Sequence, residues 1–241
     1  MRPEAFLGAR VIEAVFRPAS SPGTRHPRIG TLHGFEKRIL RWHSRRMSEN
    51  SIPAFPLRKA RVHEVCGPAA LTFAAIAAAS AGDQALWVRR ARLGGTVYPL
   101  GLASFLDPSH LLLARADTQA DGLAVAEEAL RSGALSFVVI DITQPLDLRE
   151  GRRLQLAAKT GQTTGLCIIP EGMGSNAAET RWHAAPVLDL EREDSTLMRW
   201  EIIKNKTGTF GAWDVRWDPE TRCLHVVPPV GKRPGSEGAP G

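Results

Sequence analysis

The sequence HEVCGPAALTFAAI, residues 63–76, decides the fold of this 241-residue chain. Residues 63–66 have the composition of a short buried strand, which Gly67-Pro68 interrupts. The alanine-rich segment that follows predicts a helix over about residues 72–81. A strand, a glycine turn and a helix N-terminus in this order can bind a phosphate group, because backbone N–H groups and the helix dipole both favour negative charge there.

The side chains that complete such a phosphate site are absent from this turn. A P-loop has the pattern GxxxxGK[ST], and counted from Gly67 its second glycine and its lysine would fall at Thr72 and Phe73. No lysine occurs between Lys59 and Lys159. The sequence therefore predicts a nucleotide-binding fold that has lost its nucleotide machinery.

Strand and helix patterns alternate from residue 61 onward, which predicts an α/β domain over residues 61–228. The expected strands are residues 84–88, 110–114, 135–142 and 165–169, and the expected helices are 118–131 and 148–159, the second led by a capping box of Asp147 and Glu150. This order implies right-handed crossovers and a mostly parallel central sheet with flanking helices. Strands without helices are expected at 187–191, 198–204, 212–217 and 222–227. They favour antiparallel pairing at one edge of the sheet.

The two ends of the chain differ from this domain in composition. Residues 1–61 hold 13 Lys and Arg and 4 Asp and Glu, a net charge of +9 (13 − 4), whereas residues 62–241 hold 18 and 21, a net −3 (18 − 21). We expect residues 1–60 to be a basic, poorly ordered extension. The alternatives are a basic arm for nucleic acid or an acidic partner, and a translation start at Met47. Residues 229–241, rich in Pro and Gly, are expected to be a disordered tail.

Composition also narrows the class of protein. The longest apolar run, residues 71–79, is shorter than the roughly 18 to 20 residues that cross a bilayer, and the first residues lack the order of a signal peptide. Cys66, Cys167 and Cys223 are widely spaced within strand-like sequence, which favours buried thiols and shows no metal-ligand spacing. We therefore expect a cytoplasmic protein with no membrane partner and no metal.

Several stretches resemble, in order, the ATPase core of the RecA recombinase family. They are HEVCGP at 63–68, RSGA at 131–134 before FVVID at 137–141, RRLQLAAKTG at 152–161 before a strand, and IIKNK at 202–206. The resemblance covers about residues 62–227, and Lys204-Asn205-Lys206 after an apolar strand is its most specific part. The absence of a P-loop, with AAETRWHAAP at 177–186 and the late Trp213, Trp217 and Asp218, is most similar to the ImuA group of this family.

That resemblance implies a function without catalysis. ImuA proteins are accessory proteins of DNA-damage-induced mutagenesis in bacteria. The expected partners are an ImuB-like Y-family protein that lacks polymerase activity and an error-prone C-family polymerase of translesion synthesis, with DNA contacted indirectly. No cofactor is expected, although weak ATP binding is left open. The alternatives are an ATP-gated or single-stranded-DNA-binding protein, and a regulator that engages RecA filaments by mimicking a subunit.

By the same resemblance, Gly67, Pro68 and Asp141 are the remnant of a nucleotide site. In a working relative Asp141 would hold the water shell of Mg²⁺; the alternative is a carboxylate that caps a nearby turn. Relatives also carry a glutamate after the second strand to activate water, and in this chain Arg89 and Arg90 stand there. Because both the phosphate cradle and the general base are missing, no catalytic residue is predicted.

Lys204, Asn205 and Lys206 match a segment that, in RecA filaments, reaches across the subunit interface towards a neighbour's nucleotide. In this chain the two lysines could bind acidic groups of a partner, or could simply be solvated at the end of a strand. The sequence leaves these two interpretations open.

Arg181, Trp182 and His183 lie near the position of a mobile DNA-contacting loop in RecA proteins. Aromatic and basic side chains together can stack on single-stranded bases or contact a partner. The alternative is that Trp182 packs in the core at the start of an edge strand. His63 and His225, which flank apolar strands, are expected to be structural.

Overall fold

One ten-stranded sheet passes through the described part of the chain, in the order β1-β4-β3-β5-β6-β2-β7-β8-β9-β10. The computed structural model describes residues 10–12, 52–82, 84–91, 99–189, 196–208 and 210–227. The strands are β1 Arg10–Ile12, β2 Val62–Cys66, β3 Ala85–Arg90, β4 Leu111–Ala116, β5 Phe137–Asp141, β6 Thr164–Ile168, β7 Thr180–Pro186, β8 Met198–Asn205, β9 Gly211–Asp218 and β10 Cys223–Val227. The helices are α2 Ala70–Ala81, α3 Pro99–Leu102, α4 Gln119–Ser132 and α5 Leu148–Gly161, with a 3₁₀ turn η1 at Pro108–His110.

The sheet is parallel from β1 through β7 and antiparallel from β7 through β10. This confirms the predicted α/β class with antiparallel strands at one edge. Parallel strands end at the same edge, here called the carboxyl edge, where β2, β3 and β5 end at Cys66, Arg90 and Asp141. The opposite, amino edge is where β2 begins at Val62 and where the antiparallel β8 ends at Asn205.

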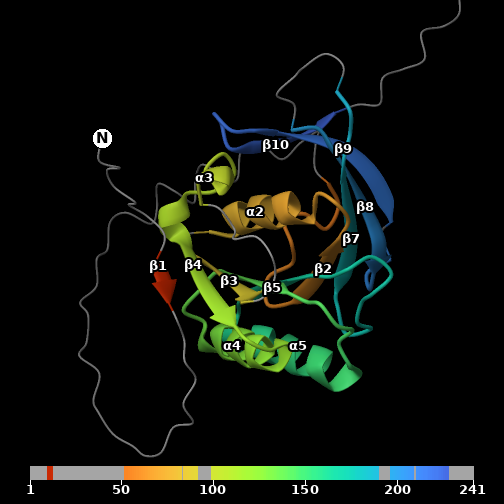
Figure 1. The fold of residues 1–241 in the computed structure, drawn as a ribbon. Coiled ribbons are helices and arrows are strands. Elements are labelled where there is room, and N and C mark those ends of the chain that lie inside the picture. Colours follow the sequence, from red (N-terminus) through yellow and green to blue (C-terminus); the bar gives the residue numbers. More distant parts are fainter. Residues whose placement is uncertain are drawn as a thin grey trace, which may run out of the picture.

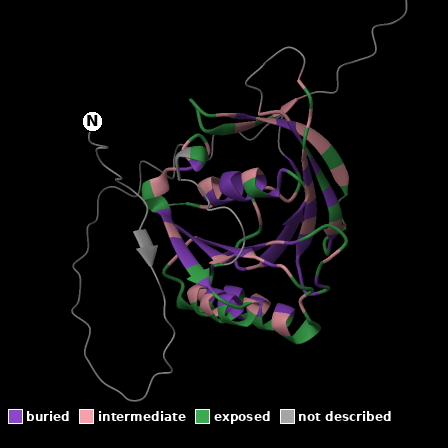
Figure 2. Cartoon of the chain, viewed as in Figure 1, coloured by how far each residue is buried: buried purple, intermediate pink, exposed green. Residues whose placement is uncertain are grey.

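Helix α2 covers one face of the sheet, and α4 and α5 cover the other (Figure 1). Alternate residues of a strand point to opposite faces, so Val65 joins the core under α2 whereas Cys66 joins the core under α4 and α5. Figure 2 shows the buried residues gathered in the sheet and on the helix sides that face it. The predicted capping box is confirmed, since Asp147 and Glu150 cap α5 reciprocally.

Two sequence predictions are wrong. The strand expected at residues 187–191 is instead β7, Thr180–Pro186, because Trp182 and Ala184 supply the alternating buried face that Val187 and Leu188 lack. Leu188 is 82% exposed, and residues 190 and 191 lie outside the described part. Cys223 is exposed rather than buried, because it lies on β10, the last strand of the sheet. Cys66 and Cys167 are buried free thiols, as predicted.

The packed structure extends upstream of residue 61. Ile52 is 4% exposed, and the ring of Phe55 packs against Trp200 with their centroids 5.0 Å apart. β1 pairs with β4 through its backbone. Residues 1–9 and 13–51 of the N-terminal extension, Met47 among them, and the predicted tail at 229–241 lie outside the described residues.

No helix among the described residues is long and apolar enough to cross a bilayer. Nor does that part of the chain bring three His, Cys, Asp or Glu side chains together as a metal site.

Candidate functional site

The turn after β2 is packed directly against β7 at the carboxyl edge. Gly67 has φ +96°, a left-handed conformation that favours glycine. A Cβ added at Gly67 would collide with the carbonyl oxygen of Ala184 and would lie 3.0 Å from the ring of His183. Any residue other than glycine at position 67 would therefore clash with β7.

The N–H groups of this turn are used inside the protein. Pro68 has no N–H group. The N–H of Ala69 donates to the carbonyl of Ala184 at 2.9 Å, and the N–H of Ala70 donates to the carbonyl of Gly67 at 3.1 Å. A phosphate cradle requires such groups to point at the ligand. Three consecutive positions of this turn thus offer no N–H to a phosphate.

Asp141 ends β5 at the same edge, and both of its carboxylate oxygens accept hydrogen bonds from β3. Trp87 Nε1 donates to Oδ1 at 2.9 Å, and Arg89 Nε donates to Oδ2 at 2.5 Å. The side chains of Asp141 and Arg89 are 8% and 18% exposed, so this ion pair is largely shielded from water. The contact joins two adjacent strands and is not the turn cap that the sequence suggested as an alternative. Both oxygens through which Asp141 would hold the water shell of Mg²⁺ thus already accept hydrogen bonds from the protein.

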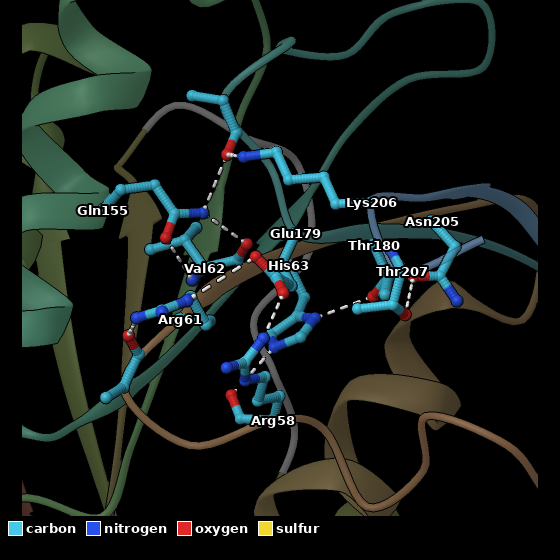
Figure 3. Close-up of polar contacts among 12 residues, drawn as sticks. Arg58, Arg61, Val62, His63, Gln155, Glu179, Thr180, Asn205, Lys206 and Thr207 are labelled. Carbon is cyan, nitrogen blue, oxygen red and sulfur yellow. Dashed lines mark hydrogen bonds and ion pairs between the residues drawn. The ribbon is translucent and has the colours of Figure 1, made fainter. Parts of the chain in front are cut away.

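A second polar cluster lies at the amino edge (Figure 3). Glu179, which is 7% exposed, accepts a hydrogen bond from Arg58 Nη1 at 2.9 Å, and its other carboxylate oxygen lies 3.6 Å from Arg61 Nε. The N–H of Glu179 donates to the carbonyl of Val62. These contacts join the segment before β2 to the residue before β7. Local sequence patterns do not predict these contacts, because 121 residues separate Arg58 from Glu179.

His63 is fully buried in this cluster and has a partner on each ring nitrogen. Nε2 lies 3.0 Å from the carbonyl oxygen of Arg58, and Nδ1 lies 2.7 Å from Thr180 Oγ1. Burial lowers the pKa of His63 to about 4, so the ring is neutral at neutral pH. Because a carbonyl only accepts, Nε2 carries the proton and Nδ1 accepts from the Thr180 hydroxyl. His63 is therefore structural, as expected from the sequence.

The Lys204-Asn205-Lys206 element also lies at the amino edge, since Asn205 pairs with Thr180 of β7. Lys204 Nζ donates to the carbonyl of Ser175 at 2.8 Å, and Lys206 Nζ donates to the carbonyl of Ala177 at 2.6 Å. Burial lowers the pKa of Lys204, while the nearby carboxylate of Glu64 acts in the opposite direction. Both ammonium groups thus hold the chain's own loop at residues 170–179. Asn205 accepts from the N–H of Thr207 at 2.9 Å, which closes the turn after β8.

That loop is also tied to α5 and to β2. Gln155 of α5 donates to the carbonyls of Val62 and Ala177, at 2.8 and 3.0 Å, and accepts from the N–H of Val62 at 3.2 Å. Ala177 therefore receives donors from both Gln155 and Lys206 (Figure 3). The loop is fixed from two layers of the fold at once.

Glu64, in the stretch HEVCGPAALTFAAI, has a structural role that its local sequence does not predict. It is 1% exposed, and its carboxylate accepts from Arg181 Nε at 2.7 Å and from the N–H of Ser175 at 2.7 Å. A Cβ on Gly174 would collide with the Arg181 guanidinium, so the loop lies directly over this pair. The available signal was a carboxylate inside a strand predicted to be buried, which needs a buried counter-charge.

The predicted group Arg181, Trp182 and His183 lies on β7 within the sheet, and its members point to different places. Trp182 is fully buried against Phe73, which fits the packing alternative. Arg181 binds Glu64 on the opposite face. His183 Nε2 lies 3.2 Å from Glu171 at the carboxyl edge. The described backbone therefore does not present these three side chains together to a ligand.

Comparison with solved structures identifies the fold of this chain. No family model matches the chain, and no curated protein matches it. Among solved structures, the crystal structure of the RadB recombinase superposes with a TM-score of 0.53 and 15% sequence identity, over 70% of this chain and 91% of RadB. The fold is RecA-like. At this identity the likeness shows the RecA-like fold alone, and in open α/β sheets of this kind ligands usually bind at the carboxyl edge.

Proposed function

We propose that this chain is a pseudo-ATPase: a non-catalytic, RecA-like accessory protein of SOS mutagenesis and translesion synthesis. The observation that carries this proposal is the carboxyl edge, where the N–H groups of Ala69 and Ala70 and the carboxylate of Asp141 all bind protein groups. By its resemblance to ImuA, the chain acts through an ImuB-like Y-family protein and an error-prone C-family polymerase. It contacts DNA through them, at the nucleoid during DNA damage.

Three features of the carboxyl edge support the proposal that the chain does not hydrolyse ATP. The turn offers no lysine, the N–H groups of Ala69 and Ala70 have carbonyl partners, and Arg89 stands where relatives carry the glutamate that activates water. Loss of a general base alone typically lowers a rate by about 10² to 10⁴. Loss of the phosphate cradle removes binding as well. Without nucleotide gating, association with a partner depends on the protein surfaces alone.

The alternative in which the chain mimics a RecA subunit has less support. It would use Lys204 and Lys206 towards a neighbouring subunit, but both ammonium groups already bind carbonyls of residues 170–179. A residual ATP-gated activity would need Asp141, whose oxygens bind Trp87 and Arg89.

The test is calorimetric titration of the purified full chain with ATP and Mg²⁺, together with a hydrolysis assay and a binding assay with the purified ImuB-like partner. We expect neither ATP binding nor hydrolysis, and an affinity for the partner that is unchanged by ATP or by its enzymatic removal. Loss of the complex on ATP depletion, or micromolar ATP binding, would overturn the proposal.

A further inference from the structure

The outer side of α5 carries a large exposed apolar side chain surrounded by basic ones. Leu156 is 64% exposed. Residues three and four positions away are its neighbours on the helix surface, and these include Arg152, Arg153 and Lys159, all of them exposed. Arg149, also exposed, lies two turns before Leu156 on the same side. We call this set, Arg149, Arg152, Arg153, Leu156 and Lys159, the α5 basic face.

The opposite side of α5 is the side that packs inside the domain. Leu154, Ala157 and Ala158 are buried in the core shared with the sheet and α4, and Gly151 is buried against Ser175 and Ala177 of the loop at residues 170–179. The α4–α5 layer lies at the outside of the molecule, away from α2, and its outward side is exposed (Figures 1 and 2). Packing within the domain therefore does not explain Arg149, Arg152, Leu156 and Lys159, whereas Arg153 contacts α4.

Charge sets this face apart from the rest of the domain. Helix α5 holds four basic residues and one acidic residue, a net charge of +3 (4 − 1), within a region, residues 62–241, whose net charge is −3 (18 − 21). The one acidic residue, Glu150, is used in the capping box. Arg153 pairs with Glu127 of α4 at 2.6 Å. Glu127 thus offsets the charge of Arg153, and Arg149, Arg152 and Lys159 supply the remaining positive charge around Leu156.

We propose that the α5 basic face is the docking site for an acidic segment of a partner protein that places an apolar side chain on Leu156. Charge complementarity selects the acidic partner, and an apolar centre within a polar rim is the usual anatomy of a protein interface. Leu148, at the edge of the same side, is 49% exposed and extends the apolar contact. This inference rests on the proposed function, because it supplies the surface through which a non-catalytic accessory protein acts.

A protein segment fits this face better than a nucleic acid. Single-stranded nucleic acid is bound by basic side chains together with aromatic ones on which bases stack. Helix α5 has no aromatic residue, and an exposed leucine adds nothing to phosphate binding. Apolar and acidic groups in the same partner segment satisfy both features of the face.

The experiment measures the affinity of the purified ImuB-like partner for the full chain and three variants. Arg149→Glu with Arg152→Glu reverses two charges, and Leu156→Ala removes the apolar centre. Arg199→Glu with Arg222→Glu makes the same change in net charge on exposed residues of β8 and of the turn before β10. We expect at least about tenfold weaker binding for the α5 charge variant, a loss of about threefold to tenfold for Leu156→Ala, and less than about twofold for the control. Equal losses in the α5 and control charge variants, or no loss in either, would overturn the inference.

A second probe separates failure of this inference from failure of the proposed function. The probe is a labelled synthetic amphipathic helix with one face of Glu and one face of Leu. Fluorescence anisotropy measures its binding to the full chain. The same peptide with Lys in place of Glu and an oligo-dT are measured beside it. If the ImuB-like protein does not bind at all, the proposed function fails; binding of the acidic peptide that is lost with the α5 charge variant would still support this site. No binding of the acidic peptide, or equal α5-dependent binding of the oligo-dT, would overturn it.

Discussion

The two edges of the sheet use buried charge in different ways. At the carboxyl edge, Asp141 is held by Trp87 and Arg89 of the adjacent strand, so the contacts stay within two paired strands. Towards the amino edge, Glu64 in the middle of β2 and Glu179 just before β7 bind arginines and backbone groups more than 100 residues away in the sequence. The carboxyl-edge contacts occupy groups that a nucleotide would need, whereas the amino-edge contacts hold the fold together. Removing a carboxylate should therefore cost little at the first edge and much at the second.

The largest effect is expected for Glu64→Gln. The substitution leaves Arg181 without its buried carboxylate partner under the loop at residues 170–179. Breaking a buried ion pair by neutralising one member typically lowers the free energy of unfolding by about 3 to 5 kcal/mol. Urea denaturation of the variant and the unmodified chain measures this difference.

The control for that variant is Glu201→Gln, an exposed carboxylate on β8. It should change the free energy of unfolding by no more than about 0.5 kcal/mol. Equal stabilities of Glu64→Gln and the unmodified chain would contradict the assignment of the amino edge as the part that holds the fold together.

The contrast between the edges also explains what the sequence could predict. The strand and helix order, the capping box of α5 and the mostly parallel sheet follow from local patterns, and the missing lysine after Gly67 is visible in the sequence alone. The partners of Glu64 and Glu179 are not, because each depends on the register of β7 against β2. The position of β7 was itself misjudged, since Val187 and Leu188 continue its apolar composition beyond Pro186.

The surroundings of the predicted site residues could not be predicted from local sequence either. Resemblance singled out Lys204, Lys206 and Trp182 by position, but it says nothing of the direction of a side chain. The lysines point to carbonyls of their own chain, and Trp182 packs in the core. The sequence gives the residue type, such as a charged or an aromatic side chain. Whether that side chain faces a partner depends on how the sheet packs.

A smaller effect, of about 2 kcal/mol, is expected from the titration of His63. The folded-state pKa of about 4 lies below the ordinary 6.5, so on acidification the unfolded chain binds a proton first. The contribution of neutral His63 to stability is thus full above pH 6.5 and is lost as the pH falls towards 4. Between pH 7 and pH 4.5, the unmodified chain should lose about 2 kcal/mol more than His63→Gln, measured by urea denaturation at each pH.

His225→Gln is the matched control, because His225 is exposed on β10. That variant should lose stability with falling pH in parallel with the unmodified chain. If His63→Gln also runs parallel to it, the amino edge does not depend on a neutral histidine, and the contrast between the edges loses one of its supports.

The smallest change in the free energy of unfolding is expected at the carboxyl edge. Variants there also test whether the ion pair or the turn after β2 excludes a nucleotide. Asp141→Asn removes a carboxylate that is less deeply buried than that of Glu64, 8% against 1% exposed. We expect a cost of about 1 kcal/mol, compared with about 0.5 kcal/mol or less for Asp214→Asn in the exposed pair with Arg199. Arg89→Ala releases Asp141 from its guanidinium partner without opening the turn. We expect calorimetry to detect no Mg²⁺-dependent ATP binding in Arg89→Ala, because Pro68 has no N–H and those of Ala69 and Ala70 still bind carbonyls. If such binding appeared, the ion pair rather than the turn would be what excludes the nucleotide, and the carboxyl edge would be a masked site instead of a vacated one.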